Sequence, residues 1–268
     1  LYKLKASSVG EPKQYLGANI EKFQLPDSRV VWSLSSRDYV KNAVKLVSDM
    51  SDMMKEDGYK LKGKAERPYQ QNYWPECDVS DELDMKLTRH YMSLIGILWW
   101  VVELGRIDII TETANLSSHM ALPREGHLEA VYSIFLYLAK HENSWIAFDD
   151  HRIECIEEDF STVEWTSQHM EVMKEEMPLN MLEPRGRPLR HTIFVNVVTR
   201  RSQAGIAQFL NGAPIDWYSK KQNTVEGSTF GSEFNALRTA VDRGISLRYK
   251  LRMFGIPVNG PIDIYCDN

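Results

Sequence analysis

Long apolar runs, paired cysteines and an N-terminal targeting signal are all lacking in this chain of 268 residues. The longest apolar stretch, residues 94–102, is too short to cross a bilayer. Cys77, Cys155 and Cys266 have no spacing typical of a disulfide framework or a zinc site, and we interpret them as reduced thiols. The chain begins at Leu1 without methionine, which favours a fragment of a longer protein. We therefore expect an intracellular protein, cytoplasmic or nuclear, without a membrane span.

The chain has only a small excess of negative charge, because the net charge is −5. Its acidic and basic residues are nevertheless unevenly distributed along the sequence. Residues 148–177 carry ten acids against two bases, whereas residues 185–252 carry twelve bases against four acids. A basic half of this kind is typical of a surface that binds phosphate, although a solvated face would have the same composition.

The C-terminal part has the clearest pattern. Two apolar runs, 204–210 and 213–222, flank Asn211 and Gly212, which predicts a hairpin with a type I′ turn. Ser228 or Thr229 can cap a helix that runs over about 229–253, and residues 261–267 are typical of one more strand. The order strand, strand, long helix, strand predicts a mixed α/β sheet.

Gly244 lies inside the predicted helix. Glycine costs about 1 kcal/mol relative to alanine in a helix interior. The sequence alone therefore predicts that Gly244→Ala raises the melting temperature if this segment is helical.

Three motifs in this part resemble the ribonuclease H domain of copia-type retrotransposon polyproteins: 217–225, beginning Trp-Tyr-Ser-Lys-Lys-Gln; 228–237, beginning Ser-Thr-Phe-Gly-Ser-Glu; and 265–268, Tyr-Cys-Asp-Asn. The resemblance implies a truncated ribonuclease H-like mixed sheet with one long helix. It also implies that nucleic acid, an RNA–DNA hybrid in the family, is the partner. We expect the basic and amide residues near these motifs to contact it: Arg200, Arg201, Lys220, Lys221 and Gln222.

Family catalysis requires carboxylates that converge on two metal ions. By resemblance, Glu233 on the first turns of the helix and Asp267 at the end of the last strand are two of these ligands. The family's first carboxylate is missing, because the first strand has no acid and either carries Asn196 in its place or has lost a short acidic segment. Without that charge we expect Mg²⁺ binding at Glu233 and Asp267 to be weak or absent, and the catalytic pair to be vestigial.

The N-terminal part predicts two strands, 15–20 and 30–34, and a helix from Ser36 to about Met54. Three further helices are expected, one opening near Tyr91, one over 109–122 and one from about 125 to 141. Tyr15-Leu16-Gly17, the segment 34–40 and Arg106-Ile107-Asp108-Ile109 resemble the region after the catalytic aspartates of copia-type reverse transcriptases. The Tyr-x-Asp-Asp motif of the polymerase is absent, so this chain alone should not polymerise.

These observations predict an α/β (α+β) protein in three parts. Residues 1–148 are the end of the palm and thumb-like helices of a reverse transcriptase, 149–190 are an acidic and then proline-rich linker, and 191–268 are the ribonuclease H-like domain. Three functions compete: a degenerate and inactive retrotransposon piece, which we favour; a metal-dependent ribonuclease H; and a non-catalytic nucleic-acid-binding module. The oligomeric state stays open.

Overall fold

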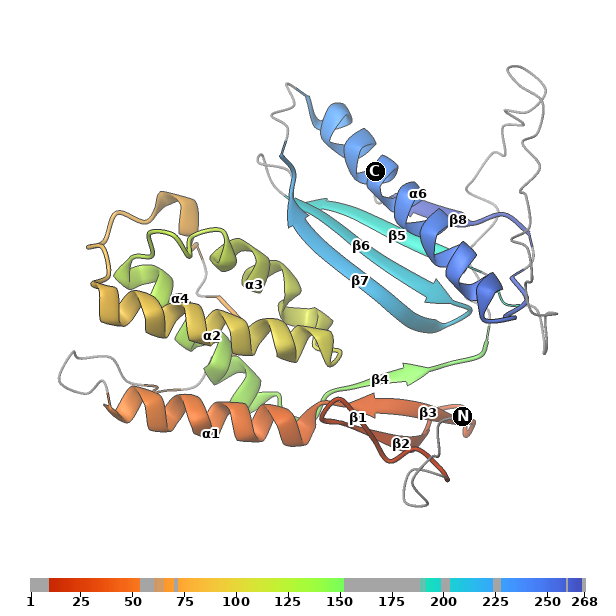
Figure 1. The fold of residues 1–268 in the computed structure, drawn as a ribbon, viewed down its shortest axis with the longest axis horizontal. Helices are drawn as coiled ribbons and strands as arrows, with labels where there is room; N and C mark the ends of the chain where they lie inside the picture. Colours follow the sequence, from red (N-terminus) through yellow and green to blue (C-terminus); the bar gives the residue numbers. More distant parts are fainter. Residues whose placement is uncertain are drawn as a thin grey trace, which may run out of the picture.

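The computed structural model describes residues 10–53, 61, 63, 65–69, 72–151, 189, 191–198, 203–223, 228–258 and 260–266. These residues form a helical layer, a small antiparallel sheet and a second, mixed sheet that carries one long helix on its face (Figure 1). The predicted α+β class is confirmed. In the part of the chain that is described, no helix is long and apolar enough to span a membrane.

The first sheet has the order β1-β2-β3-β4 and is antiparallel throughout. Its strands are β1 (Gln14–Tyr15), β2 (Ala18–Gln24), β3 (Val30–Ser35) and β4 (Trp145–Phe148). The predicted strand 30–34 is present as β3, whereas the predicted strand 15–20 is interrupted by a turn at Leu16 and Gly17, where both residues have positive φ, and continues as β2. The sequence analysis missed β4, which joins the edge of β3 from more than 100 residues further along the chain.

The helical layer consists of α1 (Arg37–Met53), α2 (Met85–Glu103), α3 (Ile110–Ser117) and α4 (Glu125–Lys140). Short 3-10 turns lie at Pro75–Cys77 and Ile107–Ile109. All four predicted helices are present. Helix α2 begins six residues before Tyr91, because the Asp84 carboxylate accepts a hydrogen bond from the Leu87 N–H at 2.7 Å and caps the helix there. Buried aliphatic and aromatic side chains from α1, α2, α3 and α4 form the larger core.

The second sheet has the order β7-β6-β5-β8. Its strands are β5 (His191–Val198), β6 (Gln203–Leu210), β7 (Ala213–Lys221) and β8 (Asp263–Cys266). Strands β5, β6 and β7 are antiparallel, and β8 runs parallel to β5. This arrangement confirms the mixed sheet and places β7 at one edge.

The turn between β6 and β7 lies at the predicted residues but has a different geometry. Asn211 has φ = 54°, whereas Gly212 is not among the residues with positive φ. A type I′ turn requires positive φ at both positions, so that prediction was wrong. A Cβ at Gly212 would lie 3.0 Å from the His151 carbonyl oxygen, and the Asn211 amide donates to the Asp150 carbonyl at 2.8 Å. The tip of the hairpin therefore packs against the residues that follow β4.

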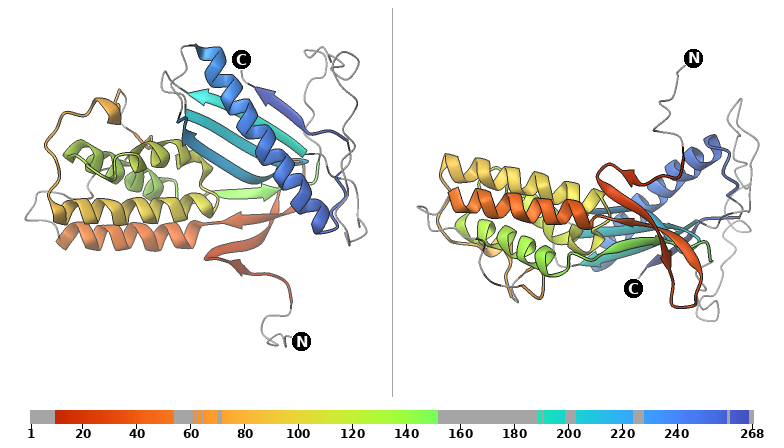
Figure 2. Two further views of the ribbon diagram at one scale, coloured as in Figure 1. Left: turned by 45° about the horizontal axis from the view of Figure 1, so that its top comes forward. Right: turned by 90° about the horizontal axis from the view of Figure 1, so that it is seen from below.

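Helix α6 (Thr229–Met253) lies on one face of the second sheet, as both views in Figure 2 show. The Ser228 hydroxyl accepts a hydrogen bond from the Gly231 N–H, which confirms the predicted cap. The face toward the sheet is made of small residues, with Ala236, Ala240 and Gly244 buried. Phe230 and Phe234 are 74% and 59% exposed. Of the large apolar residues at helical spacing, these two therefore lie away from the core, whereas Leu251 is buried and Leu247 packs beside it.

Candidate nucleic-acid interface

The edge strand β7 places alternate side chains on the two faces of the second sheet. Tyr218 pairs across the ladder with Ile206 on the face that α6 covers, and Arg243 of α6 stacks over the Tyr218 ring at 4.6 Å. Trp217 lies on the opposite face and packs against the core of the helical layer. One strand thus connects α6 with the helical layer.

A hydrogen-bonded bridge fixes β7 and β6 against α3. The buried Gln203 amide donates to the Ser219 hydroxyl at 2.7 Å and to the Thr111 carbonyl at 3.3 Å. Because one amide group satisfies partners in both halves of the molecule, it holds the second sheet in a defined position beside the helices.

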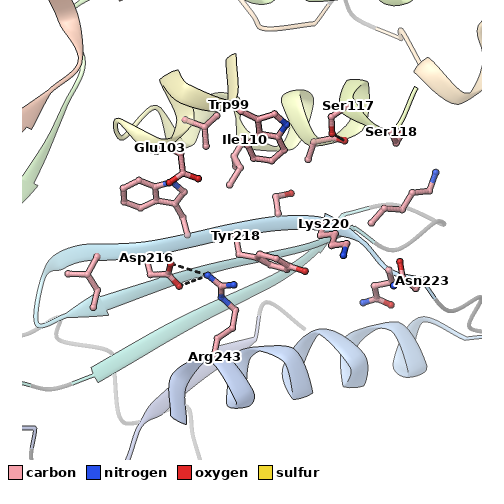
Figure 3. Close-up of a pocket in the computed structure, with 17 residues that line it drawn as sticks. Trp99, Glu103, Ile110, Ser117, Ser118, Asp216, Tyr218, Lys220, Asn223 and Arg243 are labelled. Atoms are coloured by element: carbon pink, nitrogen blue, oxygen red, sulfur yellow. Dashed lines mark hydrogen bonds and ion pairs between the residues drawn. The ribbon is translucent and has the colours of Figure 1, made fainter. Parts of the chain in front are cut away.

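A groove of about 850 Å³ runs along β7 between the helical layer and α6 (Figure 3). Trp99, Glu103 and Ser117 line it from the helices, while Asp216, Tyr218 and Lys220 line it from the strand. Its walls therefore combine aromatic rings with charged and hydroxyl groups. Such a lining suits a ligand that has flat rings and an anionic backbone.

A second, more polar cavity of about 310 Å³ continues around the end of β7. Lys220 and Lys221 of β7 lie on one side, and Arg238 of α6 lies on the other. Amide side chains complete the lining, namely Gln222, Asn223 and Asn235. Three bases face one acid, Asp242, in this cavity, which makes it a suitable binding site for phosphate groups.

A network of polar side chains between the second sheet and α6 fixes Asp216 and Arg243, two of the residues that line the groove. Arg243 binds both oxygens of Asp216, at 2.7 and 3.0 Å, and Gln208 donates to the same carboxylate. The Gln208 amide oxygen lies 3.0 Å from Nε2 of the buried His191. Burial lowers the pKa of His191, although the hydrogen bond to Gln208 acts in the opposite direction. A neutral His191 therefore belongs to the scaffold of the groove.

The predicted binding residues have different outcomes. Lys220, Lys221 and Gln222 come together, because all three line both the groove and the polar cavity. Arg200 and Arg201 lie outside the described residues.

The predicted metal ligands cannot be compared as a pair. Glu233 lies on the first turns of α6 and is half-buried, but it lines neither the groove nor the polar cavity. Asp267 lies outside the described residues, one position after β8 ends. The backbone of Asn196 is in β5, the strand next to β8, immediately after the Val195–Cys266 pair. Mg²⁺ binding by Glu233 and Asp267 therefore stays a prediction.

The sequence analysis missed Glu103, Ser117, Asp216 and Arg243 as groove residues. They come from four different elements, α2, α3, β7 and α6, and each has a role only through tertiary contact. Asp216 offered one local signal, because it stands alone as an acid among the apolar residues of a predicted strand. No local pattern distinguishes Arg243, and only its ion pair with Asp216 identifies it as a groove residue.

Comparisons with known proteins give two distant relatives. The chain is 25% identical over 178 residues to the retrovirus-related Pol polyprotein from transposon RE1 of Arabidopsis thaliana. That match covers 66% of this chain and 10% of the polyprotein, so the chain spans about a tenth of that relative's length. The chain is also 23% identical over 162 residues to the secreted RxLR effector protein 161 of Plasmopara viticola, which covers 60% of this chain and 94% of the effector.

No family model and no solved structure matches the chain. The similarity to the transposon polyprotein supports a retrotransposon origin for this chain.

Proposed function

We propose that this chain is a degenerate piece of a copia-type polyprotein, from the end of the reverse transcriptase into the ribonuclease H domain, that binds nucleic acid without cutting it. The polar cavity carries this proposal, since lysines of β7 and an arginine of α6 converge there on a space fit for phosphates. The mixed sheet β7-β6-β5-β8, with α6 between β7 and β8 in sequence, supports the proposal, because the resemblance implies a mixed sheet with one long helix.

The proposed lack of cleavage follows from the central strand. β5 carries Asn196 next to the end of β8, where the resemblance calls for a carboxylate. An amide oxygen can contact Mg²⁺, but it lacks the charge that offsets the dehydration of the ion and bridges two ions poorly. Glu233 and Asp267 then hold at most one weakly bound Mg²⁺.

An RNA–DNA hybrid is the preferred ligand under this proposal, with its phosphates in the polar cavity. Unpaired bases at its end stack on the aromatic side chains of the groove, such as Trp99 and Tyr218. The lysines supply affinity without sequence preference, because they contact phosphates and not base edges.

The test of binding is fluorescence anisotropy of a labelled RNA–DNA hybrid at several salt concentrations. We expect Lys220→Ala with Lys221→Ala to weaken binding about tenfold or more at low salt. The salt slope should fall by about 2, since each lost phosphate contact removes about 0.9 of a released counterion. Lys13→Ala with Lys45→Ala is the matched control, because both lysines are exposed and lie on β1's flank and on α1. Equal losses in the two double variants, or no binding by the unchanged chain, would contradict the proposal.

The test of cleavage uses the same hybrid with Mg²⁺ or Mn²⁺ and separates the products on a denaturing gel. We expect no product above the metal-free control for the unchanged chain, because the first carboxylate is missing. Glu233→Gln should give the same result. A product that forms with metal and disappears in Glu233→Gln would instead favour the surviving ribonuclease H.

A further inference from the structure

The two ends of the groove along β7 carry opposite charge. In Figure 3, Glu103 and Asp216 lie at one end of the groove, and Lys220 and Asn223 lie towards the other. Asp216 is already bound by Arg243. Glu103 is exposed, and among the residues that the structure describes no hydrogen bond or ion pair engages its carboxylate. The groove therefore has one available acid at one end and the lysines at the other.

Aromatic rings lie at the acidic end. Trp99 and Glu103 are four residues apart on α2, so their side chains lie on the same side of that helix. Trp217 comes from β7, on the other wall, and faces the helical layer. Both indoles are half-buried and line the groove. A planar ring bound here has aromatic surface to stack on and a carboxylate at the same end of the groove.

The strand sets the distance between the two ends. Trp217, Ser219 and Lys221 share the face of β7 that is turned to the helices, since side chains two residues apart lie on one face of a strand. At about 3.3 Å per residue, Lys221 lies roughly 13 Å along the strand from Trp217. An extended nucleotide fits this span, because the flexible lysine side chain can reach back to its phosphate.

A carboxylate at this end distinguishes the four bases by hydrogen bonding. Ionised carboxylates only accept hydrogen bonds, and they can accept two at once. Guanine has two neighbouring donors on its Watson–Crick edge, the N1–H and the 2-amino group. Adenine and cytosine each have one amino group beside an acceptor nitrogen, and uracil has one N–H between two carbonyl oxygens. Those acceptors repel a carboxylate, so Glu103 suits guanine.

We infer, resting on the function proposed above, that the groove binds an unpaired guanine nucleotide. Its base lies at Trp99 and Trp217, its Watson–Crick edge is on the Glu103 carboxylate, and its phosphate is at Lys220 and Lys221. Glu103 also sets the direction of the nucleotide, because a phosphate beside a carboxylate is repelled. Free GMP and a guanosine at the end of a strand offer the same chemistry.

Calorimetric titration with free nucleotides tests the first source. GMP should bind about tenfold more tightly than AMP, CMP or UMP, within the discrimination that a bidentate base contact gives. IMP lacks the 2-amino group and should bind severalfold less tightly than GMP. By contrast, 7-deaza-GMP keeps both donors and should bind as tightly as GMP. If IMP binds as tightly as GMP, the contact with Glu103 is wrong.

The second source is tested with an RNA–DNA hybrid that has a single-stranded 3′ extension of two nucleotides. Fluorescence anisotropy should show about tenfold tighter binding for a guanosine extension than for a cytidine or adenosine extension. A guanine preference with GMP alone assigns the groove to a free nucleotide, and one with the hybrid alone assigns it to a strand end. No guanine preference with either probe would overturn the inference.

The decisive variant is Glu103→Gln, which removes the charge at nearly constant size and replaces one acceptor by a donor. The guanine preference should disappear, with the circular dichroism spectrum unchanged. Glu129→Gln is the matched control, because Glu129 is an exposed glutamate of α4 that lines neither the groove nor the polar cavity, and this variant should keep the preference. A preference that survives Glu103→Gln, or that both variants lose equally, would refute the role of Glu103.

A blunt-ended hybrid separates this inference from the proposed function. If the unchanged chain binds the blunt hybrid but shows no preference among extensions or free nucleotides, the guanine site is wrong and nucleic-acid binding stands. If it binds no hybrid but prefers GMP over the other nucleotides, nucleic-acid binding is wrong and the guanine site stands.

Discussion

Arg106→Ala is expected to destabilise the helical layer by about 2–3 kcal/mol, because it removes the charge-assisted hydrogen bonds that a buried guanidinium makes. The Arg106 side chain is only 1% exposed. It donates to both oxygens of Asp108, at 2.9 and 2.7 Å, and to the His141 carbonyl at 3.0 Å. It thereby joins the segment after α2 to the residue that ends α4. The loss would leave a carboxylate and a carbonyl without their strongest partner.

Urea unfolding, followed by circular dichroism, measures this effect. Arg89→Ala is the control, because Arg89 is exposed on α2 and makes its hydrogen bond to the sulfur of Met85. Its effect should stay within about 0.5 kcal/mol. Arg106→Met combined with Asp108→Leu should recover part of the loss, because methionine refills the buried space and no carboxylate is then left without its partner. A loss for Arg106→Ala as small as for Arg89→Ala would show that the ion pair contributes little.

The ion pair of Arg106 and Asp108 should also make the unfolding free energy depend on pH. Burial would raise the pKa of Asp108, but the hydrogen bonds and charge of Arg106, together with the Tyr137 hydroxyl, lower it below the ordinary value of 3.8. A folded-state pKa below the unfolded value gives stability that is present above the unfolded pKa and is lost as the pH falls through the folded pKa. The unfolding free energy should therefore fall in acid, and less steeply in Asp108→Asn.

Gly244→Ala is expected to destabilise the protein, in contrast to the gain that the sequence alone predicts. The residue is helical, as predicted, but it is buried against the sheet. A Cβ there would lie 2.7 Å from Cδ1 of Ile193 and 3.2 Å from Cδ1 of Ile262. Ile193 is fully buried, so its methyl group has little room to move. Overpacking costs about 1–3 kcal/mol and the helix gain is about 1 kcal/mol, so we expect a net loss of up to about 2 kcal/mol.

A double-mutant cycle isolates the cause. Ile193→Val removes the Cδ1 atom that the new methyl group would strike, and it should itself cost about 1 kcal/mol. With valine at 193, Gly244→Ala should cost less or become favourable, and the two changes should be non-additive. Strict additivity, or a rise in melting temperature for Gly244→Ala alone, would mean that the helix lifts from the sheet at little cost.

Local signals predicted most of the elements, because periodicity, caps and the Asn211–Gly212 pair act within a few residues. The sequence-based predictions failed where contacts with a distant segment of the chain determine the local structure. β4 has four residues and is a strand only because β3 offers its edge. The turn at Gly212 takes its shape beside the carbonyl of His151. On α6, both faces have helical spacing, and only the position of the sheet determines that the alanines and glycine are buried.

The candidate site was predictable in its basic part only. Lys220, Lys221 and Gln222 are consecutive and lie in a motif that carries the family resemblance. The groove needs Trp99 and Ser117 from a separate part of the chain, and no local pattern relates them to β7. The ion pair of Asp216 and Arg243 is likewise a long-range contact.

The position of β8 in the sequence affects how the second sheet folds. β8 pairs with β5, and Thr192 of β5 therefore lies beside Asp263, which is about 70 residues further along the chain. During synthesis, β5, β6 and β7 leave the ribosome first, and β5 then has one edge of backbone N–H and C=O groups without its final partner. Closing so long a loop costs entropy before the parallel contacts offset it, which makes this pairing a late step. In that interval the central strand of the sheet is open to other chains, and aggregation competes with folding there.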